Sequence, residues 1–178
     1  MKGKLYGIGI GPGDPELLTL KAVRLIREAD VIAVPGKVKT ETVAYQITVQ
    51  AVPEIADKEC VEVYYPMSKD PEILEKCHTE AAEKIETYLA AGKTVAFLTL
   101  GDTTVYSTYI YVHTKLLEKG YEAEIVSGIT SFCAVAARLN IGLVEKAEEL
   151  HIIPASYQIE EALKLKGTKV IHFGKEFL

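Results

Sequence analysis

Short runs of β-branched and apolar residues alternate along this chain with segments of helical periodicity. Five such runs fall within the first 127 residues: Leu5 to Ile10, Val31 to Val34, Val61 to Tyr65, Val95 to Leu100 and Ala123 to Val126. A helix between two strands carries the chain back to the edge where it started, so strands in this rhythm pair in parallel. The sequence therefore predicts an α/β fold with an open, mainly parallel five-stranded sheet.

Helices are predicted between these strands. An aspartate followed by proline is a frequent helix start, and it predicts helices from Asp14 to about Ala29 and from Asp70 to Gly92. Apolar spacing predicts two more, over Thr40 to Gln50 and Thr104 to Lys119. With these helices, the segment that ends near residue 127 forms a self-contained N-terminal α/β domain, 1–127.

The pattern starts again in residues 128–178 with a helix, a strand, a second helix and a second strand. These are expected at Phe132 to Leu139, His151 to Pro154, Ile159 to Leu165 and Lys169 to Phe173. Two strands in a segment of this size cannot bury a sheet of their own. We expect the start of a second α/β domain, which either packs on the first or belongs to an incomplete chain.

Charge and apolar run length exclude several classes of protein. The 178 residues include 20 basic and 25 acidic side chains, a net charge of −5, so no overall positive field is available to hold nucleic acid. The apolar stretches are far shorter than the ~18 residues of a membrane-spanning helix, and glycines interrupt the apolar start. We therefore predict a cytoplasmic protein with neither a nucleic-acid nor a membrane partner.

Cysteine and histidine spacing predicts no metal site. Cys60, Cys77 and Cys133 are widely spaced, which indicates neither a disulfide framework nor a zinc ribbon. His78 and His151 stand far apart in the sequence and have no ligand spacing around them.

Glycine-rich turns follow three of the predicted strands, where ligands of open α/β sheets gather. They are Gly7 to Asp14, Gly101-Asp102 and Gly128 to Ser131. The first turn fails the dinucleotide fingerprint, because Pro12 stands where the third glycine is needed, and it lacks the Gly-Lys-Ser/Thr end of a phosphate loop. Taken singly, none of the turns requires a ligand. The first can be a tight turn between a strand and a helix, and the second and third can be helix caps.

Together, the three turns resemble the motifs of the tetrapyrrole methylase family, which uses S-adenosylmethionine. The family's opening Gly-x-Gly-Pro-Gly-Asp turn and Leu-Leu-Thr stand here as Gly9 to Asp14 and Leu17 to Thr19. Its Gly-Asp-Pro motif is matched at Gly101-Asp102, and its Pro-Gly-x-Thr-Ser motif at Gly128 to Ser131. Three matches in this order are highly specific, and the resemblance covers essentially the whole chain.

Within this family, the sequence around the motifs is most similar to that of the precorrin-2 or cobalt-factor-2 C-20 methyltransferases. The similar segments are Phe97 to Asp102, Val105 to Tyr109 and Ile129 to Phe132. The resemblance implies methyl transfer from S-adenosylmethionine to a reduced tetrapyrrole in cobalamin biosynthesis, by a homodimer of two-domain subunits. Whether the substrate already holds cobalt stays open.

The resemblance also implies a set of residues that line the pocket for S-adenosylmethionine. They are Pro12, Leu100, Gly101, Asp102, Val105, Thr130, Ser131 and Phe173. The chain departs from the family at three places: Thr103 and Ser127 replace prolines, and His172-Phe173 replaces a Met-Lys pair. Each departure is expected to loosen a loop or to alter a contact.

Methyl transfer to carbon depends mainly on positioning, so no catalytic residue is assigned. Tyr106, Asp102 and His113 are the nearest candidates to receive the proton that leaves the methylated carbon. Three lysines that follow the second and third strands are candidates for binding substrate carboxylates: Lys37, Lys39 and Lys69. Two alternatives stay open: a truncated, non-catalytic donor-binding module, and another paralogue such as a uroporphyrinogen or diphthamide-pathway methylase.

Overall fold

The computed structural model describes residues 2–66, 68, 70–154 and 159–172. The chain divides into two compact units, residues 1–130 and 131–178. Each unit has its own sheet and is treated by itself.

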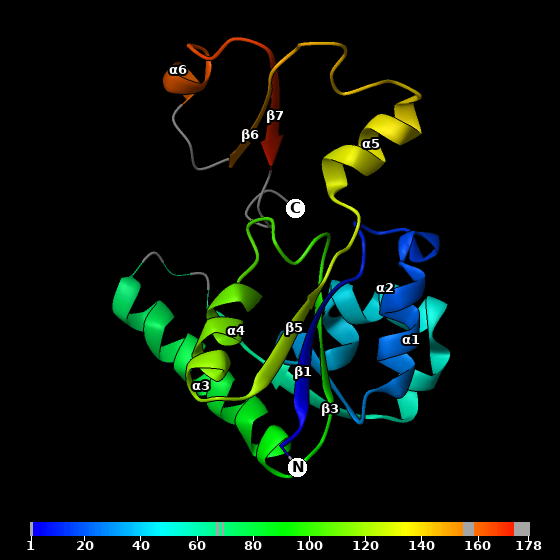
Figure 1. The fold of residues 1–178 in the computed structure, drawn as a ribbon, viewed down its shortest axis with the longest axis vertical. Helices are drawn as coiled ribbons and strands as arrows, with labels where there is room; N and C mark the ends of the chain where they lie inside the picture. Colours follow the sequence, from blue (N-terminus) through cyan, green and yellow to red (C-terminus); the bar gives the residue numbers. More distant parts are fainter. Residues whose placement is uncertain (1, 67, 69, 155–158, 173–178) are drawn as a thin grey trace. The chain divides into compact units, whose positions relative to one another are not determined.

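The larger unit is built on a five-stranded sheet (Figure 1). Its strands lie in the order β3-β2-β4-β1-β5. Its strands are β1 (Lys4–Gly9), β2 (Val31–Pro35), β3 (Glu59–Val63), β4 (Val95–Thr99) and β5 (Glu122–Val126). Every neighbouring pair is parallel. The α/β class and the parallel five-stranded sheet predicted from the sequence are confirmed.

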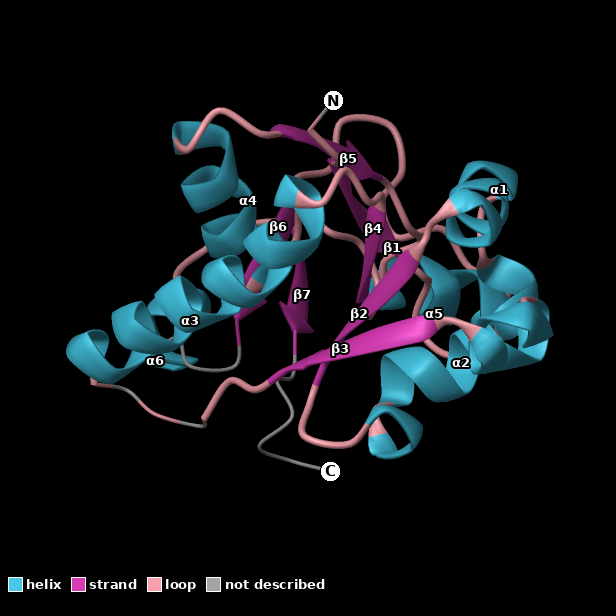
Figure 2. Ribbon diagram, turned by 90° about the horizontal axis from the view of Figure 1, so that it is seen from below, coloured by secondary structure: helices cyan, strands magenta, loops and turns pink. Residues whose placement is uncertain are grey.

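Helices cover both faces of this sheet. The helices are α1 (Leu20–Glu28), α2 (Val43–Ala51), α3 (Pro71–Ala90) and α4 (Tyr109–Glu118), with short 3₁₀ turns at Pro15–Leu17, Lys39–Glu41 and Pro53–Asp57. Figure 2 shows α1 and α2 on one side of the sheet and α3 and α4 on the other. The central strand β4 is buried on both faces: Ala96 and Leu98 pack toward the α1/α2 side, and Val95 and Phe97 toward the α3/α4 side. Its continuous apolar run is the pattern of a parallel strand between two helical layers.

The predicted start of the first helix is wrong. Asp14 caps only the 3₁₀ turn, through a 2.9 Å hydrogen bond from the Glu16 backbone N–H. Leu18 is extended and buried, and the α-helix begins after Thr19, whose Oγ1 accepts from the Ala22 N–H. The chain makes this extra turn because Leu18 must enter the core before the helix can lie along the sheet.

The helix predicted from Thr104 begins five residues later, at Tyr109. The Asp102 carboxylate binds the Thr104 backbone N–H, which closes a turn of the aspartate type. Tyr106 then adopts a positive φ of 50°, which an α-helix does not allow. Residues 102–108 are therefore a loop at the end of β4, not the first turns of a helix.

The smaller unit contains α5 (Ser131–Leu139), β6 (Leu150–Pro154), α6 (Ile159–Ala162) and β7 (Thr168–His172). Its two strands are parallel, with Leu150 opposite Thr168. His151 Nε2 lies 2.6 Å from the Lys166 carbonyl oxygen, which ties β6 to the segment before β7.

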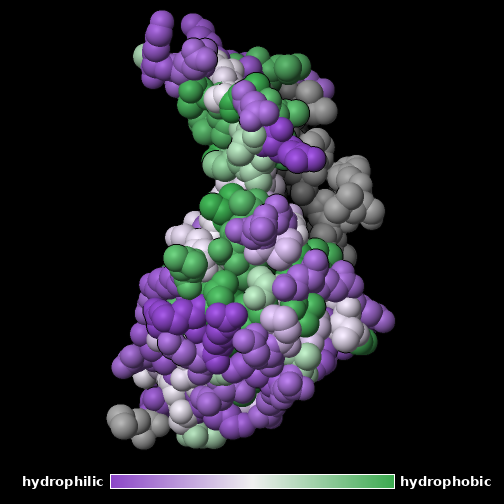
Figure 3. Space-filling model, turned by 90° about the vertical axis from the view of Figure 1, so that its right-hand side faces the viewer, coloured by the Kyte–Doolittle hydropathy of each residue, from purple (hydrophilic) through white to green (hydrophobic). Residues whose placement is uncertain are grey.

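Hydrophilic side chains predominate on the α1/α2 side of the larger unit, and hydrophobic ones are scattered over it (Figure 3). Within the part of the chain that the structure describes, no helix combines the length and the apolar character needed to cross a bilayer.

Replacing Glu124 with glutamine is expected to flatten the acid dependence of stability. The Glu124 carboxylate accepts from Lys21 at 2.7 Å and from Lys4 at 2.9 Å, which lowers its pKa to about 2. Because this pKa lies below the ordinary ~4.3, the pair stabilises the fold above about pH 4.3 and is lost as the pH falls toward 2. All three side chains are a third or more exposed, so the gain is at most about 1 kcal/mol.

Urea unfolding at about pH 6 and about pH 2.5 measures this difference. Glu122→Gln on the same strand is the matched control, because Glu122 has no ion pair with any described residue. A wild-type advantage over E124Q that stays the same at both pH values would contradict the prediction.

Candidate functional site

The three glycine turns predicted from the sequence lie together at the carboxyl edge of the sheet. They follow β1, β4 and β5, and β1 lies between the other two strands. The strand ends are level, with Gly9 opposite Thr99 and Ile8 opposite Val126. The chain crosses from one side of β1 to the other between β4 and β5, which makes this edge the switch point where open α/β sheets bind ligands.

Glycine is required where the turns meet. A Cβ on Gly9 would lie 2.6 Å from the Gly128 nitrogen, and a Cβ on Gly128 would lie 2.1 Å from the Gly101 carbonyl oxygen. Gly11 and Gly101 also exchange two backbone hydrogen bonds, of 2.8 and 3.2 Å. The backbones of all three turns therefore touch, with no side chain between them.

Asp102 ties two of the turns together. Its Oδ1 accepts from the Thr104 N–H at 2.8 Å and from the Thr104 hydroxyl, and its Oδ2 accepts from the Gly128 N–H at 2.7 Å. Asp102 is only 8% exposed. Burial alone would raise the pKa of this carboxyl, but the hydrogen bonds from Thr104 and Gly128 outweigh burial and leave the pKa below its ordinary value. Asp102 does not cap α4, so the simple helix-cap interpretation is wrong.

Thr103, which replaces the proline of the family motif, makes contacts that a proline cannot make. Its side chain is fully buried, and its hydroxyl lies 3.2 Å from the Val126 carbonyl oxygen and 3.4 Å from that of Gly7. The hydroxyl can donate to either strand, β5 or β1. This substitution alters a contact and fastens the loop instead of loosening it.

The predicted site residues occupy these turns to different degrees. Pro12, Leu100, Gly101, Asp102, Val105 and Thr130 all lie in the turns after β1, β4 and β5. The Thr130 hydroxyl is buried, and no described residue forms a hydrogen bond with it. Ser131 is the first residue of α5 and belongs to the smaller unit. Phe173 lies outside the described residues.

The candidates for proton transfer occupy different environments. Tyr106 is exposed on the loop before α4. The His113 Nδ1 lies 3.0 Å from the Tyr109 hydroxyl, and burial lowers the pKa of its imidazole. The Tyr109 ring fills the space beside Gly7, where a Cβ would lie 2.0 Å from a ring carbon. His113 is therefore part of a packed pair behind β1.

Two of the three lysines of the candidate basic patch, Lys37 and Lys39, contact other residues of the chain. The Lys37 ammonium lies over the Tyr64 ring, 4.4 Å from its centroid. Lys39 lies over Tyr45 and within 3.4 Å of the Ala56 carbonyl oxygen. Lys69 lies outside the described residues.

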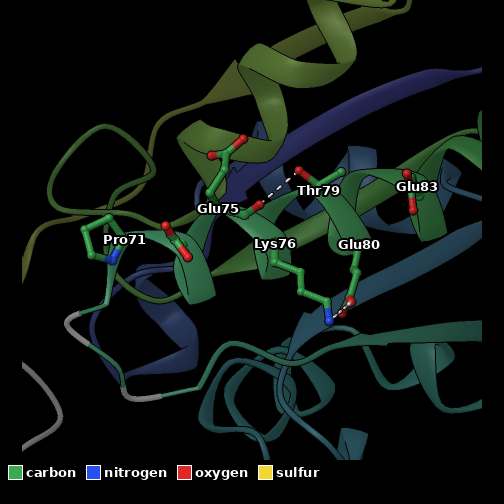
Figure 4. A pocket seen from close by; sticks show the side chains of 7 residues that line it. Pro71, Glu75, Lys76, Thr79, Glu80 and Glu83 are labelled. Carbon is green, nitrogen blue, oxygen red and sulfur yellow. Dashed lines mark hydrogen bonds and ion pairs between the residues drawn. The ribbon is translucent and has the colours of Figure 1, made fainter.

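A shallow hollow of about 650 Å³ runs along the outer side of α3 (Figure 4). The described side chains that line it include four carboxylates and one lysine: Glu72, Glu75, Glu80, Glu83 and Lys76. Lys76 pairs with Glu80. None of the predicted site residues is among the described residues that line it, and its net negative charge disfavours an acidic ligand.

Sequence reasoning missed a group of buried polar atoms near the same edge. The Tyr65 hydroxyl, His78 Nε2 and Thr99 Oγ1 are buried and have no hydrogen-bond partner in the part of the chain that the structure describes. A signal was available for His78, because its spacing puts it on the same face of α3 as the buried residues Ala81, Ala82 and Ile85. No group of histidine, cysteine and carboxylate side chains suited to a metal occurs among the residues described.

Known proteins that resemble this chain belong to one family. The family model for Tetrapyrrole (Corrin/Porphyrin) Methylases matches residues 4–174. A protein from Methanocaldococcus jannaschii named “Probable cobalt-precorrin-2 C(20)-methyltransferase” is 43% identical over 170 residues, which cover 94% of this chain and 71% of that protein.

Two solved structures share the fold. A cobalamin synthesis related protein (CobF) from Corynebacterium diphtheriae superposes with a TM-score of 0.73 at 24% identity, over 96% of this chain and 72% of its own. Uroporphyrin-III C-methyl transferase from Thermus thermophilus, complexed with S-adenyl homocysteine, has a TM-score of 0.60 at 28% identity, over 87% of this chain and 60% of its own.

Proposed function

This chain belongs to the tetrapyrrole (corrin/porphyrin) methylases, and from that membership we propose the reaction that it catalyses. The reaction is methyl transfer from S-adenosylmethionine to carbon 20 of a reduced tetrapyrrole, precorrin-2 or cobalt-factor-2, in cobalamin biosynthesis. The name of the Methanocaldococcus relative supports the position of the methyl group. The Thermus structure with S-adenyl homocysteine supports the identity of the donor.

The observation that carries the proposal is the convergence of the three motif turns on one strand edge. Gly9, Gly101 and Gly128 bring the backbones into contact there. Glycines at a strand end let a ligand approach the main chain closely. The unpartnered Thr130 hydroxyl offers a hydrogen bond to a ligand at the same place.

We take the residues that would hold the donor from the family pattern: Pro12, Leu100, Gly101, Asp102, Val105, Thr130, Ser131 and Phe173. The first six lie in these turns. S-adenosylmethionine supplies an electrophilic methyl group on a sulfonium. The chain's own task is to keep that group and the accepting carbon in line and close together, which is the larger part of catalysis in a displacement of this kind.

Asp102 acts here by positioning. Both of its oxygens hold backbone N–H groups of neighbouring turns, which keeps the β4 and β5 turns at a fixed separation. A meso carbon of a reduced tetrapyrrole is electron-rich, so no strong base needs to act before the methyl group is transferred. We assign no catalytic residue to the later loss of the proton.

Calorimetric titration with S-adenosylmethionine and with S-adenosylhomocysteine tests donor binding, and incubation with reduced precorrin-2 tests transfer. We expect saturable binding of both and a product methylated at carbon 20. A flat titration with both compounds would remove the methyltransferase proposal. A methyl group at another carbon would keep the family and overturn the C-20 assignment in favour of another paralogue.

Three further expectations stay predictions for this chain. They are a homodimeric assembly, a cytoplasmic location, and a division into an N-terminal domain over 1–127 and the start of a second domain over 128–178.

A further inference from the structure

Three polar side-chain atoms on one face of the larger unit are buried and have no hydrogen-bond partner among the described residues. They are the Tyr65 hydroxyl, His78 Nε2 and Thr99 Oγ1. A buried polar group without a partner loses its hydrogen bonds to water and gains none in return, so folded proteins rarely keep one without a use for it. Three such atoms in one region indicate a ligand that supplies the missing partner.

The three side chains share a face and an edge of the sheet. Successive residues of a strand point to opposite faces, so Thr99 points to the same side as Phe97, and Tyr65 continues the alternation of Val61 and Val63. This is the face that α3 and α4 cover, and Tyr65 packs against that core. His78 reaches the same core from α3. Because all the strands are parallel, Tyr65 and Thr99 stand at the carboxyl edge, where the glycine turns also lie.

Tyr65 and His78 form a pair. Their ring centroids are 5.7 Å apart, and the two rings are inclined at 57°. The Tyr111 ring lies flat on the His78 imidazole at 4.3 Å. His78 is only 4% exposed, whereas Tyr111 is 55% exposed, so Tyr111 is a side chain that can move aside to admit a ligand.

The charges beside this pair cancel. Glu75 and Lys115 both act on His78, and they form an ion pair with each other. Burial lowers the pKa of His78, so its imidazole is neutral at pH 7, and burial raises the pKa of Tyr65, so its phenol stays protonated. The pair therefore offers neutral hydrogen-bond donors and no net charge.

The chemistry of the unpartnered atoms selects the ligand. A phenol, a threonine hydroxyl and a neutral imidazole can each donate a hydrogen bond, and no carboxylate is among the unpartnered groups in the described part of the chain. The same groups can also accept, but a carboxylate is the one acidic group that can take hydrogen bonds from several of them at once, because its two oxygens offer about four acceptor positions. Thr99 lies two strands from β3, about 10 Å across the sheet, which places it between the pair and the glycine turns.

We propose that Tyr65 and His78 bind an acidic side chain of the tetrapyrrole substrate and so orient its ring toward the glycine turns. This assignment rests on the proposed function. It names Tyr65 and His78 as the residues that fix the orientation of the bound substrate. It places the substrate acid on the inner side of α3, away from the acidic outer hollow.

Tyr65→Phe and His78→Phe test the proposal in the full-length protein, because each removes the polar atom and keeps an aromatic ring. We expect KM for the tetrapyrrole to rise about ten-fold or more in each variant. We also expect kcat within about two-fold of wild type, unchanged affinity for S-adenosylmethionine, and a Tm equal to or above that of wild type. Removal of an idle unpartnered atom would raise Tm without any change in KM. The combination of a raised KM with an undiminished Tm is therefore specific to a binding role.

Tyr121→Phe is the control for KM alone, because the Tyr121 side chain, unlike that of Tyr65, has a hydrogen-bond partner, Glu86. Tyr121 belongs to the same α3/α4 core but precedes β5, at the amino edge of the sheet, so its KM should equal that of wild type. Wild-type KM values in both Tyr65→Phe and His78→Phe would overturn the assignment and leave the methyltransferase function intact. A wild-type protein that binds donor but methylates no tetrapyrrole would overturn the proposed function and this assignment with it.

Discussion

Replacing Gly128 with alanine is expected to lower the free energy of unfolding by about 3 kcal/mol and to weaken S-adenosylmethionine binding about a hundred-fold. The added Cβ would lie 2.1 Å from the Gly101 carbonyl oxygen and 2.7 Å from the Gly9 carbonyl carbon. Both neighbours are backbone atoms of turns that are fastened to the sheet, so they cannot rotate away as a flexible side chain would. Either the three turns separate or the strand ends shift.

Urea unfolding and calorimetric titration measure the two effects of G128A. Gly142→Ala is the control, because its Cβ would meet only the Val144 carbonyl oxygen at an ordinary 3.6 Å. G142A should unfold and bind like wild type. A G128A protein with wild-type stability and donor affinity would show that the three turns are not packed as described here.

Replacing Asp102 with asparagine is expected to cost about 2 kcal/mol of stability and to weaken donor binding about ten-fold or more. The two Asp102 oxygens accept from Thr104 and from Gly128, on different turns. An asparagine has one acceptor oxygen, so its NH₂ group would face a backbone N–H that needs an acceptor. One buried donor is left without a partner, and the tie between the β4 and β5 turns is lost.

The stability difference between wild type and D102N is also expected to depend on pH, which can be measured by urea unfolding. Because the folded pKa lies below the unfolded value of ~3.9, the carboxylate stabilises the fold above about pH 4 and loses this effect as the pH falls through the folded pKa. D102N should therefore approach wild-type stability in acid. Asp70→Asn is the control, because Asp70 accepts from the Glu72 N–H in the same local geometry but on the surface, where asparagine caps equally well. Equal losses in D102N and D70N would contradict the role given to Asp102.

The strands were easier to predict than the starts of the helices. β2 and β4 are almost uninterrupted apolar runs buried on both faces, and β1, β3 and β5 still carry short apolar stretches, so the positions of the strands follow from local composition. Asp14 and Thr19 are both good caps, and the choice between them depends on where Leu18 can be buried. The start of α4 depends on Asp102, whose local turn with Thr104 keeps the following residues out of the helix.

The site divides in the same way. The glycines and Asp102 could be found from the sequence, because each belongs to a short motif of adjacent residues. Tyr65 and His78 could not be paired, because they lie on a loop and a helix separated by residues that carry no motif. Nothing in the pattern showed that the Thr103 hydroxyl would reach carbonyl groups of β1 and β5.

The sequence by itself determined the parallel sheet, the order of its elements and the family of the chain. These features depend on apolar periodicity and on contiguous motifs, which act over a few residues at a time. Only the tertiary structure decided which glycines touch, what the Asp102 carboxylate binds and which polar atoms are buried without partners. Those outcomes depend on distances between segments that are separated in the sequence, by 26 residues for Asp102 and Gly128 and by 96 for Gly7 and Thr103, and such distances are set by the packing of helices on the sheet.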